Sequence, residues 1–252
     1  MSASPPDAAP PAIRIAGLVK EYRSWLGRRR VRALDGITFH VPRGEVVGLL
    51  GPNGGGKTTT LKCLLGFLRP TAGEVEVLGR PPTDLAARAR LGFLPEESPF
   101  PGFLRLEAGL DFFGALARVP RRERRERIPR LLERVGLADA RRRRLDELSK
   151  GMARRFGIAQ ALIGEPELLI LDEPTSGLDP LGMRDFGRLL AELRAAGLTV
   201  LLSSHQLGQV ETVCDRAAVL HRGKLLAFDP VPAIVAASGE KTLEAAFLRL
   251  VA

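Results

Sequence analysis

The chain has 252 residues, and its 38 Lys and Arg against 29 Asp and Glu give a formal net charge of +9. No run of about eighteen apolar residues is present, and the N-terminus lacks the charged-then-apolar pattern of a signal peptide, so the sequence predicts neither a membrane-spanning helix nor a leader. The length suits one large domain.

The first third of the chain alternates predicted strands and turns. Residues 1–11 consist largely of Pro, Ala and Ser, a composition that favours a disordered tail. Short apolar runs then predict five strands, over residues 13–19, 33–41, 46–50, 74–78 and 91–94. The third run is apolar throughout, which is typical of a strand buried on both faces.

A glycine-rich loop follows this third strand. Residues 51–58 read Gly-Pro-Asn-Gly-Gly-Gly-Lys-Thr, and a helical pattern begins at Lys57. A strand, a glycine loop and a helix N-terminus together aim backbone N–H groups at one concavity, which suits a phosphate. Lys57 would reach the outer phosphates of a nucleotide, and the Thr58 hydroxyl would ligate Mg²⁺. The structural alternative is a glycine-rich turn that carries a lysine by chance.

The pattern becomes helical from Leu106 to about Gly164. Apolar residues recur at helical spacing on two faces, one formed by Leu110, Phe113, Leu116 and Ala117 and the other by Ile128, Leu131, Leu132 and Val135. Ser149 falls at the head of the next helix, where its hydroxyl and the free backbone donors could meet an anion.

A second buried-strand pattern, residues 168–171, ends at two adjacent carboxylates. It delivers Asp172 and Glu173 to the carboxyl end of a strand, which is where ligands bind in open α/β sheets. Asp172 could hold Mg²⁺ through oxygen, and Glu173 could act as general base toward a water molecule. An ordinary polar strand end is the alternative.

Strand and helix alternate again over the rest of the chain. The patterns predict a helix ending at Ala196, a strand over 199–203, a short helix near Val210 and a strand over 217–220. A parallel α/β core interrupted by a helical subdomain is the architecture that these periods imply.

Three short motifs complete the set. Leu148-Ser149-Lys150-Gly151-Met152 precedes the carboxylate pair, Ser176-Gly177-Leu178-Asp179 follows it, and His205 stands in Ser-Ser-His-Gln after the next strand. In this order the motifs resemble those of the nucleotide-binding subunit of an ATP-binding cassette (ABC) transporter, and the likeness covers nearly all of the chain from Ile13 onward.

The resemblance implies an α/β fold with a P-loop NTPase core, in which helices flank a parallel sheet. An antiparallel β subdomain lies at the N-terminal side, and an α-helical signature subdomain is inserted. We expect a single domain over 12–252, with the core in 12–97 and 165–230, the helical subdomain in 98–164 and C-terminal helices in 231–252.

The resemblance also implies a role for each motif residue. Glu173 and His205 would be catalytic, Asp172, Thr58 and Glu96 would hold Mg²⁺, and Tyr22 would stack on adenine. The motif Ser149, Lys150 and Gly151 would contact the γ-phosphate from the other protomer of a dimer, and Asp179 lies in the loop that crosses to that protomer. The nucleotide itself would be held by Tyr22, Gly51, Pro52, Asn53, Gly54, Gly55, Gly56, Lys57, Thr58 and Thr59.

The chain departs from the family pattern at two motifs. Glu96 stands where the family usually has a glutamine, which keeps an oxygen for metal or water but adds a negative charge to an acidic site. Lys150 and Met152 replace Gly and Gln in the signature, where Lys150 adds a cation close to the expected phosphate.

Arginine clusters over 28–30, 121–130 and 141–144 account for the net charge. They could form a basic surface for anionic lipid or nucleic acid. Residues 121–127 interleave Arg and Glu at helical spacing, however, and no aromatic residues alternate with the arginines to stack bases. We therefore favour a solvated helix face, with weak attraction to a negatively charged membrane surface as a secondary effect.

The segment 98–104, Ser-Pro-Phe-Pro-Gly-Phe-Leu, places apolar residues on a proline-rich loop. Phe100 and Phe103 either tuck under the helical subdomain or form an exposed dock for a membrane partner. The sequence leaves both open.

The resemblance implies an ATPase that needs ATP and Mg²⁺, forms a head-to-tail homodimer and drives a separate transmembrane permease, with export as the expected direction. It would sit on the cytoplasmic face of the inner membrane, held there through the permease. The alternative is a soluble cassette ATPase that acts on nucleic acid or ribosomes. Only one cassette is present and no long coiled coil separates the motifs, so we expect no nucleic acid partner.

Overall fold

The computed structural model describes residues 10–23 and 30–251, and the predicted tail lies mostly outside these ranges. The elements follow one another along the chain in the order β1 (Ile13–Arg23), β2 (Arg30–Val41), β3 (Val46–Leu50), α1 (Lys57–Leu64), β4 (Ala72–Val77), α2 (Leu85–Ala89), β5 (Leu91–Leu94), α3 (Leu106–Leu116), α4 (Arg121–Arg134), η1 (Ala138–Ala140), η2 (Leu145–Glu147), α5 (Lys150–Leu162), β6 (Leu168–Asp172), α6 (Pro180–Ala195), β7 (Thr199–Ser204), α7 (Leu207–Val213), β8 (Arg216–His221), β9 (Lys224–Pro230), α8 (Val231–Ser238) and α9 (Leu243–Val251).

Two sheets form the core. A three-stranded antiparallel sheet has the order β2-β1-β4, and a six-stranded sheet has the order β5-β6-β7-β3-β8-β9. Strands β5, β6, β7, β3 and β8 run parallel, and β9 pairs antiparallel with β8. The α/β fold with an antiparallel β subdomain is thereby confirmed.

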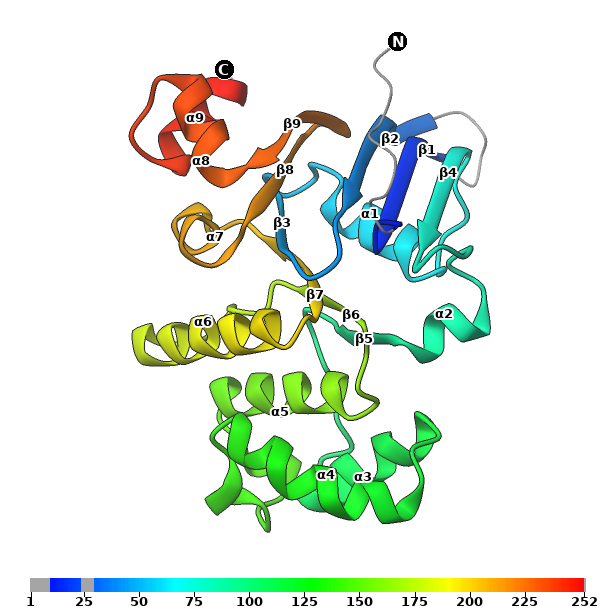
Figure 1. Cartoon of the computed structure of the whole chain (residues 1–252), viewed down its shortest axis with the longest axis vertical. Helices are drawn as coiled ribbons and strands as arrows, with labels where there is room; N and C mark the ends of the chain where they lie inside the picture. Colours follow the sequence, from blue (N-terminus) through cyan, green and yellow to red (C-terminus); the bar gives the residue numbers. More distant parts are fainter. Residues whose placement is uncertain (1–9, 24–29, 252) are drawn as a thin grey trace.

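The central strands are apolar because they are covered on both faces. Every residue of β3, β6 and β7 is buried, as expected for strands inside a parallel sheet. Helix α1 lies beside the antiparallel strands, while α3, α4 and α5 gather at the opposite end of the molecule (Figure 1).

The helical subdomain has an aromatic centre. The ring of Phe156, fully buried on α5, meets Phe100 edge to face with 4.8 Å between ring centroids, and Phe113 lies 5.9 Å from Phe100. Phe100 therefore tucks under the subdomain, whereas Phe103 is 72% exposed. The two phenylalanines of the proline-rich loop thus take opposite environments.

Four elements in the described part of the chain have no counterpart among the predicted ones. Helix α2 has only five residues, η1 and η2 are single turns, and β9 reads Lys-Leu-Leu-Ala-Phe-Asp-Pro without strict alternation. Both C-terminal helices are present as predicted, with α8 packed near β9 and α7 near α9.

Candidate functional site

Strand order explains why the candidate residues converge. The neighbours β5, β6, β7 and β3 are parallel, so their carboxyl ends meet at one edge of the sheet. The segments that leave these ends carry Glu96, Asp172 and Glu173, His205, and the glycine loop, respectively. Ligands bind along such an edge in open α/β sheets.

Glycine is required at two places in the loop. Gly51 has a φ of 154°, and a Cβ added there would stand 2.2 Å from the carbonyl oxygen of Leu220. Gly56 caps α1 with a φ of 112°, and its Cβ would stand 2.7 Å from the Leu34 side chain. The loop is therefore pressed against β8 at one end and β2 at the other, which fixes its shape.

The Lys57 ammonium group lies inside the curve of this loop. Lys57 is 6% exposed, and its Nζ donates to the carbonyl oxygen of Gly51 at 2.6 Å and to that of Pro52 at 3.4 Å. The same Nζ is 3.8 Å from Oε1 of Glu173. The cation thus connects the loop to the carboxylate that follows β6.

The other loop residues surround this lysine at the N-terminus of α1. Asn53, Gly54 and Thr58 are exposed, so their polar groups are open to a ligand. The remaining predicted loop residues are buried or half-buried, namely Pro52, Gly55, Gly56 and Thr59.

Ser203 on β7 organises the two carboxylates. Its Oγ donates to Oδ1 of Asp172 at 2.5 Å and accepts the backbone N–H of Glu173 at 2.9 Å. Glu173 has a φ of +47°, a left-handed conformation that costs a residue with a side chain about 1–3 kcal/mol. Both carboxylate side chains are buried.

His205 completes the group from the end of β7. Its Nδ1 is 2.8 Å from Oε2 of Glu173, and its side chain is 53% exposed. Glu173 therefore has Lys57 near one carboxylate oxygen and His205 at the other. The structure brings together Lys57, Asp172, Glu173 and His205.

Arg154 is a site residue that the sequence analysis missed. It is 6% exposed on α5, and its guanidinium donates to the carbonyl oxygens of Asp172, Glu173, Pro174, Pro95 and Glu96. Burial lowers the pKa of Arg154, while the charges of Asp172, Glu96 and Glu173 oppose that shift. This arginine fastens the helical subdomain to the segments after β5 and β6. Its sequence neighbourhood, Met-Ala-Arg-Arg-Phe-Gly, carries no signal that separates it from Arg155.

Glu96 and Tyr22 make fewer contacts with the rest of the site. Glu96 is exposed, and its backbone oxygen accepts from Arg154 at 2.9 Å. Tyr22 is 39% exposed near the end of β1, with Nζ of Lys20 at 5.6 Å from its ring centroid. Within the described residues, no hydrogen bond or ion pair links either side chain to Lys57, Asp172 or Glu173.

The signature residues lie on the helical subdomain, at the start of α5. Ser149 caps this helix by accepting the backbone N–H of Met152 at 3.2 Å, and Ser149 and Lys150 are exposed. The Lys150 stem covers Gly177, where an added Cβ would stand 2.6 Å from Cδ of the lysine. Asp179 caps α6 by accepting from the backbone N–H of Gly182 at 2.7 Å. No hydrogen bond or ion pair in the described part of the chain joins these side chains to the glycine loop.

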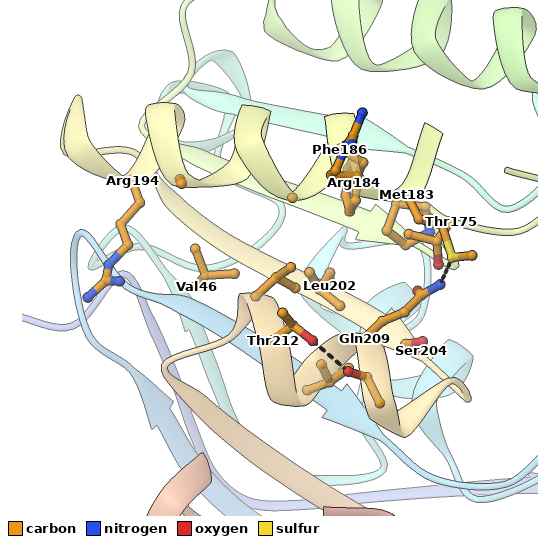
Figure 2. Close-up of a pocket in the computed structure, with 16 residues that line it drawn as sticks. Val46, Thr175, Met183, Arg184, Phe186, Arg194, Leu202, Ser204, Gln209 and Thr212 are labelled. Atoms are coloured by element: carbon orange, nitrogen blue, oxygen red, sulfur yellow. Dashed lines mark hydrogen bonds between the residues drawn. The ribbon is translucent and has the colours of Figure 1, made fainter. Parts of the chain in front are cut away.

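A hollow of about 510 Å³ lies behind the site, between α6 and α7 (Figure 2). Thr175 and Ser204, which line it, adjoin the carboxylate segment and His205 in the chain. Gln209 donates to Sδ of Met183 across the hollow, joining α7 to α6 (Figure 2). None of the predicted site residues lines this hollow.

Comparison with known proteins decides the family. The sequence matches the ABC transporter family over residues 34–176, more than half of the chain. The chain belongs to the ABC transporter family. Within the described ranges of this cassette, no helix has both the length and the apolar character needed to cross a bilayer.

Curated relatives and a solved structure agree with the assignment to the ABC transporter family. An uncharacterized ABC transporter ATP-binding protein of Synechocystis is 44% identical over 82% of this cassette and 59% of its own length. The Nod factor export ATP-binding protein I of Paraburkholderia xenovorans is 40% identical over 81% of this cassette and 67% of its own length. A solved ATP-binding subunit of an ABC transporter superposes with a TM-score of 0.84 at 30% identity, covering 95% of this cassette and 99% of that chain.

The cassette spans about three-fifths to two-thirds of the length of these curated relatives. The solved structure confirms the predicted fold over nearly the whole chain.

Proposed function

We propose that this cassette binds ATP with Mg²⁺, pairs head to tail with a second copy and hydrolyses the ATP to drive a separate membrane permease. The observation that supports the proposal is the set of contacts around the buried Glu173 carboxylate at the sheet edge. Lys57, Glu173 and His205 are connected there by contacts of 3.8 and 2.8 Å, next to a glycine loop shaped for phosphate.

The oxygen donors at this edge fit Mg²⁺. Carboxylate and hydroxyl oxygens are the ligands that this cation takes, and Asp172 and Thr58 supply one of each beside the loop. Ser203 orients the Asp172 carboxylate by hydrogen bonding to Oδ1, leaving Oδ2 for a metal. We assign Glu96 to the same metal as a further ligand, on the strength of its place beside Asp172 at the end of β5. When bound, Mg²⁺ would neutralise charge on the β- and γ-phosphates.

Hydrolysis needs a base, and Glu173 is placed to be one. Its carboxylate would accept a proton from water as the water oxygen bonds to the γ-phosphorus and the bond to the ADP oxygen breaks. His205, 2.8 Å from Oε2, would hold the Glu173 carboxylate and contact the γ-phosphate. Lys57 would remain with the outer phosphates.

The exposure of the signature segment supports the dimer. Ser149 and Lys150 are solvent-exposed at the N-terminus of α5, where backbone donors and the helix dipole favour an anion. We assign Ser149, Lys150 and Gly151 to the γ-phosphate bound by the partner, and Asp179 to the loop that crosses between protomers. Tyr22, exposed on β1, would stack on the adenine.

The experiment that tests this proposal is Glu173→Gln. Turnover should fall on the order of a hundred- to ten-thousand-fold, as typical for loss of a general base, while ATP still binds and traps a dimer detectable by size-exclusion chromatography. Glu126→Gln, which changes an exposed carboxylate on α4, should leave both unchanged. A Glu173→Gln protein that turns over at the wild-type rate overturns the assignment.

A permease partner would place the cassette on the cytoplasmic face of the inner membrane. Leu85 on α2 is 79% exposed and Leu116 at the end of α3 is 65% exposed. Phe103 precedes α3 at its other end and is 72% exposed. A hollow of about 330 Å³ includes Leu85 and Leu116. Exposed apolar side chains of this kind mark protein contacts, and we assign both the hollow and Phe103 to contacts with cytoplasmic helices of the permease.

Phe103→Asp should weaken recovery of the co-expressed permease and leave nucleotide binding intact. Leu248→Asp, at a 61% exposed leucine on α9, is the matched control. Recovery that is the same for both variants removes Phe103 from the dock.

Export is the direction that we propose, because a 40% identical relative carries export in its name. Action on nucleic acid or ribosomes is not favoured. ATPase activity stimulated by the co-expressed permease, and not by DNA or ribosomes, distinguishes the two functions.

A further inference from the structure

The helical subdomain carries a hollow of about 410 Å³, well away from the glycine loop in sequence. It lies between the start of α3, the first half of α4 and the turn that follows η1. We call it the arginine hollow after the five arginines that line it, Arg105, Arg121, Arg125, Arg141 and Arg142. Glu107 and Asp111 are the acidic residues of the lining.

Backbone contacts hold the three segments of the hollow together. The N–H of Leu106 donates to the carbonyl oxygen of Arg143 at 3.0 Å, and that of Glu107 donates to Arg141 at 3.2 Å. Across the helix pair, Nε of Arg124 donates to Oδ1 of Asp111 at 2.7 Å. Arginines that are distant in sequence are therefore brought together by the fold.

The positive charge of the hollow is not neutralised by the protein. Within the described residues, none of the five arginines has a carboxylate within 4.0 Å, and none of their side chains donates a hydrogen bond. Asp111 is already paired with Arg124, and no Lys, Arg or His nitrogen of the described chain lies within 4.0 Å of Glu107.

Other arginines of α4, outside the hollow, form ion pairs within the protein. The interleaved Arg and Glu pattern of α4 predicts ion pairs along the helix, and two form, Arg122 with Glu126 and Arg127 with Glu123. These pairs agree with the solvated-face interpretation for that side of α4. Arg121 and Arg125 are also exposed, but they line the hollow and form no such pair among the described residues.

Helix stability does not account for the arrangement. Arg121 is the first residue of α4, and the preceding Pro120 provides no side-chain cap. A cation at that position opposes the helix dipole, which favours anions at the N-terminus. A bound anion would satisfy both the arginines and the helix terminus.

We propose that the arginine hollow binds a ligand with two or more adjacent phosphate groups. A guanidinium group presents a planar fork that matches phosphate oxygens and is charged at every relevant pH. Five such groups around one hollow of this size suit clustered phosphates better than a single one. Among the described residues, none that lines the hollow is aromatic and could stack on a base, which disfavours nucleic acid. A soluble oligophosphate and the headgroup of cardiolipin, in which a glycerol joins two phosphate groups, share the required chemistry.

The test compares two double variants that change the net charge equally. Arg125→Gln with Arg141→Gln changes the hollow, whereas Arg122→Gln with Arg130→Gln changes α4 outside it. Binding of inorganic tripolyphosphate is measured by calorimetry with an excess of a non-hydrolysable ATP analogue. Sedimentation with phosphatidylcholine vesicles, with and without cardiolipin, measures lipid binding. The glycine loop is intact in every variant, so its contribution cancels.

The hollow variant should bind at least tenfold more weakly than wild type, since two charge-assisted hydrogen-bonding groups are lost, and the control should stay within about threefold, the loss expected from general charge alone. Arg105→Gln with Arg142→Gln should repeat the loss from the other side of the hollow. Loss with tripolyphosphate alone identifies a soluble ligand, and loss with cardiolipin alone identifies the lipid. Equal weakening in hollow and control variants, or no binding of either probe by wild type, overturns the proposal.

Discussion

The sheet edge and the arginine hollow differ in whether their charged side chains are paired within the protein. At the edge, each of the buried groups Lys57, Arg154 and Asp172 has a protein partner within hydrogen-bonding distance. In the hollow, five exposed arginines lack one among the described residues. Burial explains the difference, because a charge removed from water must be paired, whereas an exposed charge is solvated without help.

The comparison shows which charges serve the fold and which are free for a ligand. Buried charges that are fully engaged are expensive to disturb, since removing one partner leaves the other unpaired. Exposed and unpaired arginines should cost the fold little when they are removed. The effects of substitutions on the free energy of unfolding should therefore differ in size and in sign between the sheet edge and the arginine hollow.

The largest effect is expected for Arg154→Leu. The change strips hydrogen bonds from the carbonyl oxygens of the segments after β5 and β6, and breaking such a buried charged network typically costs about 3–5 kcal/mol. Urea unfolding at neutral pH measures the loss. Arg155→Leu is the control, because Arg155 is half-buried and its strongest contact is one hydrogen bond of 3.1 Å to the Gly136 carbonyl oxygen. Equal losses for the two variants would show that Arg154 does not fasten the subdomain.

Ser203→Ala should have the next largest effect. It removes the donor to Asp172 and leaves the N–H of Glu173 without an acceptor in a fully buried position. The expected loss of unfolding free energy is about 1–3 kcal/mol. The Mg²⁺ concentration for half-maximal turnover should also rise, because the Asp172 carboxylate is no longer oriented.

Ser204→Ala is the matched control, since Ser204 is also buried and accepts a hydrogen bond from the N–H of Gln206. It should lower stability without changing the Mg²⁺ requirement. A change in that requirement for Ser204→Ala but not for Ser203→Ala would contradict the role given to Ser203.

The contrast also explains how much the sequence could predict. The sequence could predict four site residues because each follows a strand that an apolar run locates, or a glycine loop after such a strand. They are Lys57, Asp172, Glu173 and His205. Arg154 and Ser203 lie inside a helix and a strand, and their partners are set only when α5 and β7 pack beside β6. Strand β9 lacks a clear period and α2 is too short to show one. The functions of Tyr22, Glu96 and the signature stay predictions, because they need a ligand or a second copy.

Removing arginines from the hollow should stabilise the protein slightly. The Arg125→Gln and Arg141→Gln pair lowers repulsion among unpaired cations, so we expect a rise in Tm of about one degree at low salt. The rise should disappear at high ionic strength, where screening removes the repulsion. Arg122→Gln with Arg130→Gln should not raise Tm, because Arg122 is paired with Glu126. A fall in Tm for the hollow variant would mean that its arginines already have partners in the fold.

Glu167 is intermediate between the buried, paired charges of the sheet edge and the exposed, unpaired arginines of the hollow, since it is paired but 40% exposed. It accepts from Nε of Arg90 and from Nη1 of Arg43 at the start of β6, and these contacts, Arg90 first, hold its pKa below the ordinary value of 4.5. A lowered pKa means that the carboxylate stabilises the folded state fully above about pH 5, and that this contribution is lost as the pH falls through 4.5 and the folded-state pKa.

Glu167→Gln should therefore lower the free energy of unfolding at pH 7 by no more than about 1 kcal/mol, because solvent screens a half-exposed pair. The difference in unfolding free energy between wild type and variant should become smaller when urea unfolding is repeated at pH values approaching 4. Glu192→Gln, which removes a 62% exposed carboxylate 3.6 Å from Arg134, should cost less at pH 7. If the difference in unfolding free energy widened on acidification, it would have the wrong sign for an ion pair that stabilises the folded state. Glu167 would then not be the stabilising partner of Arg43 and Arg90.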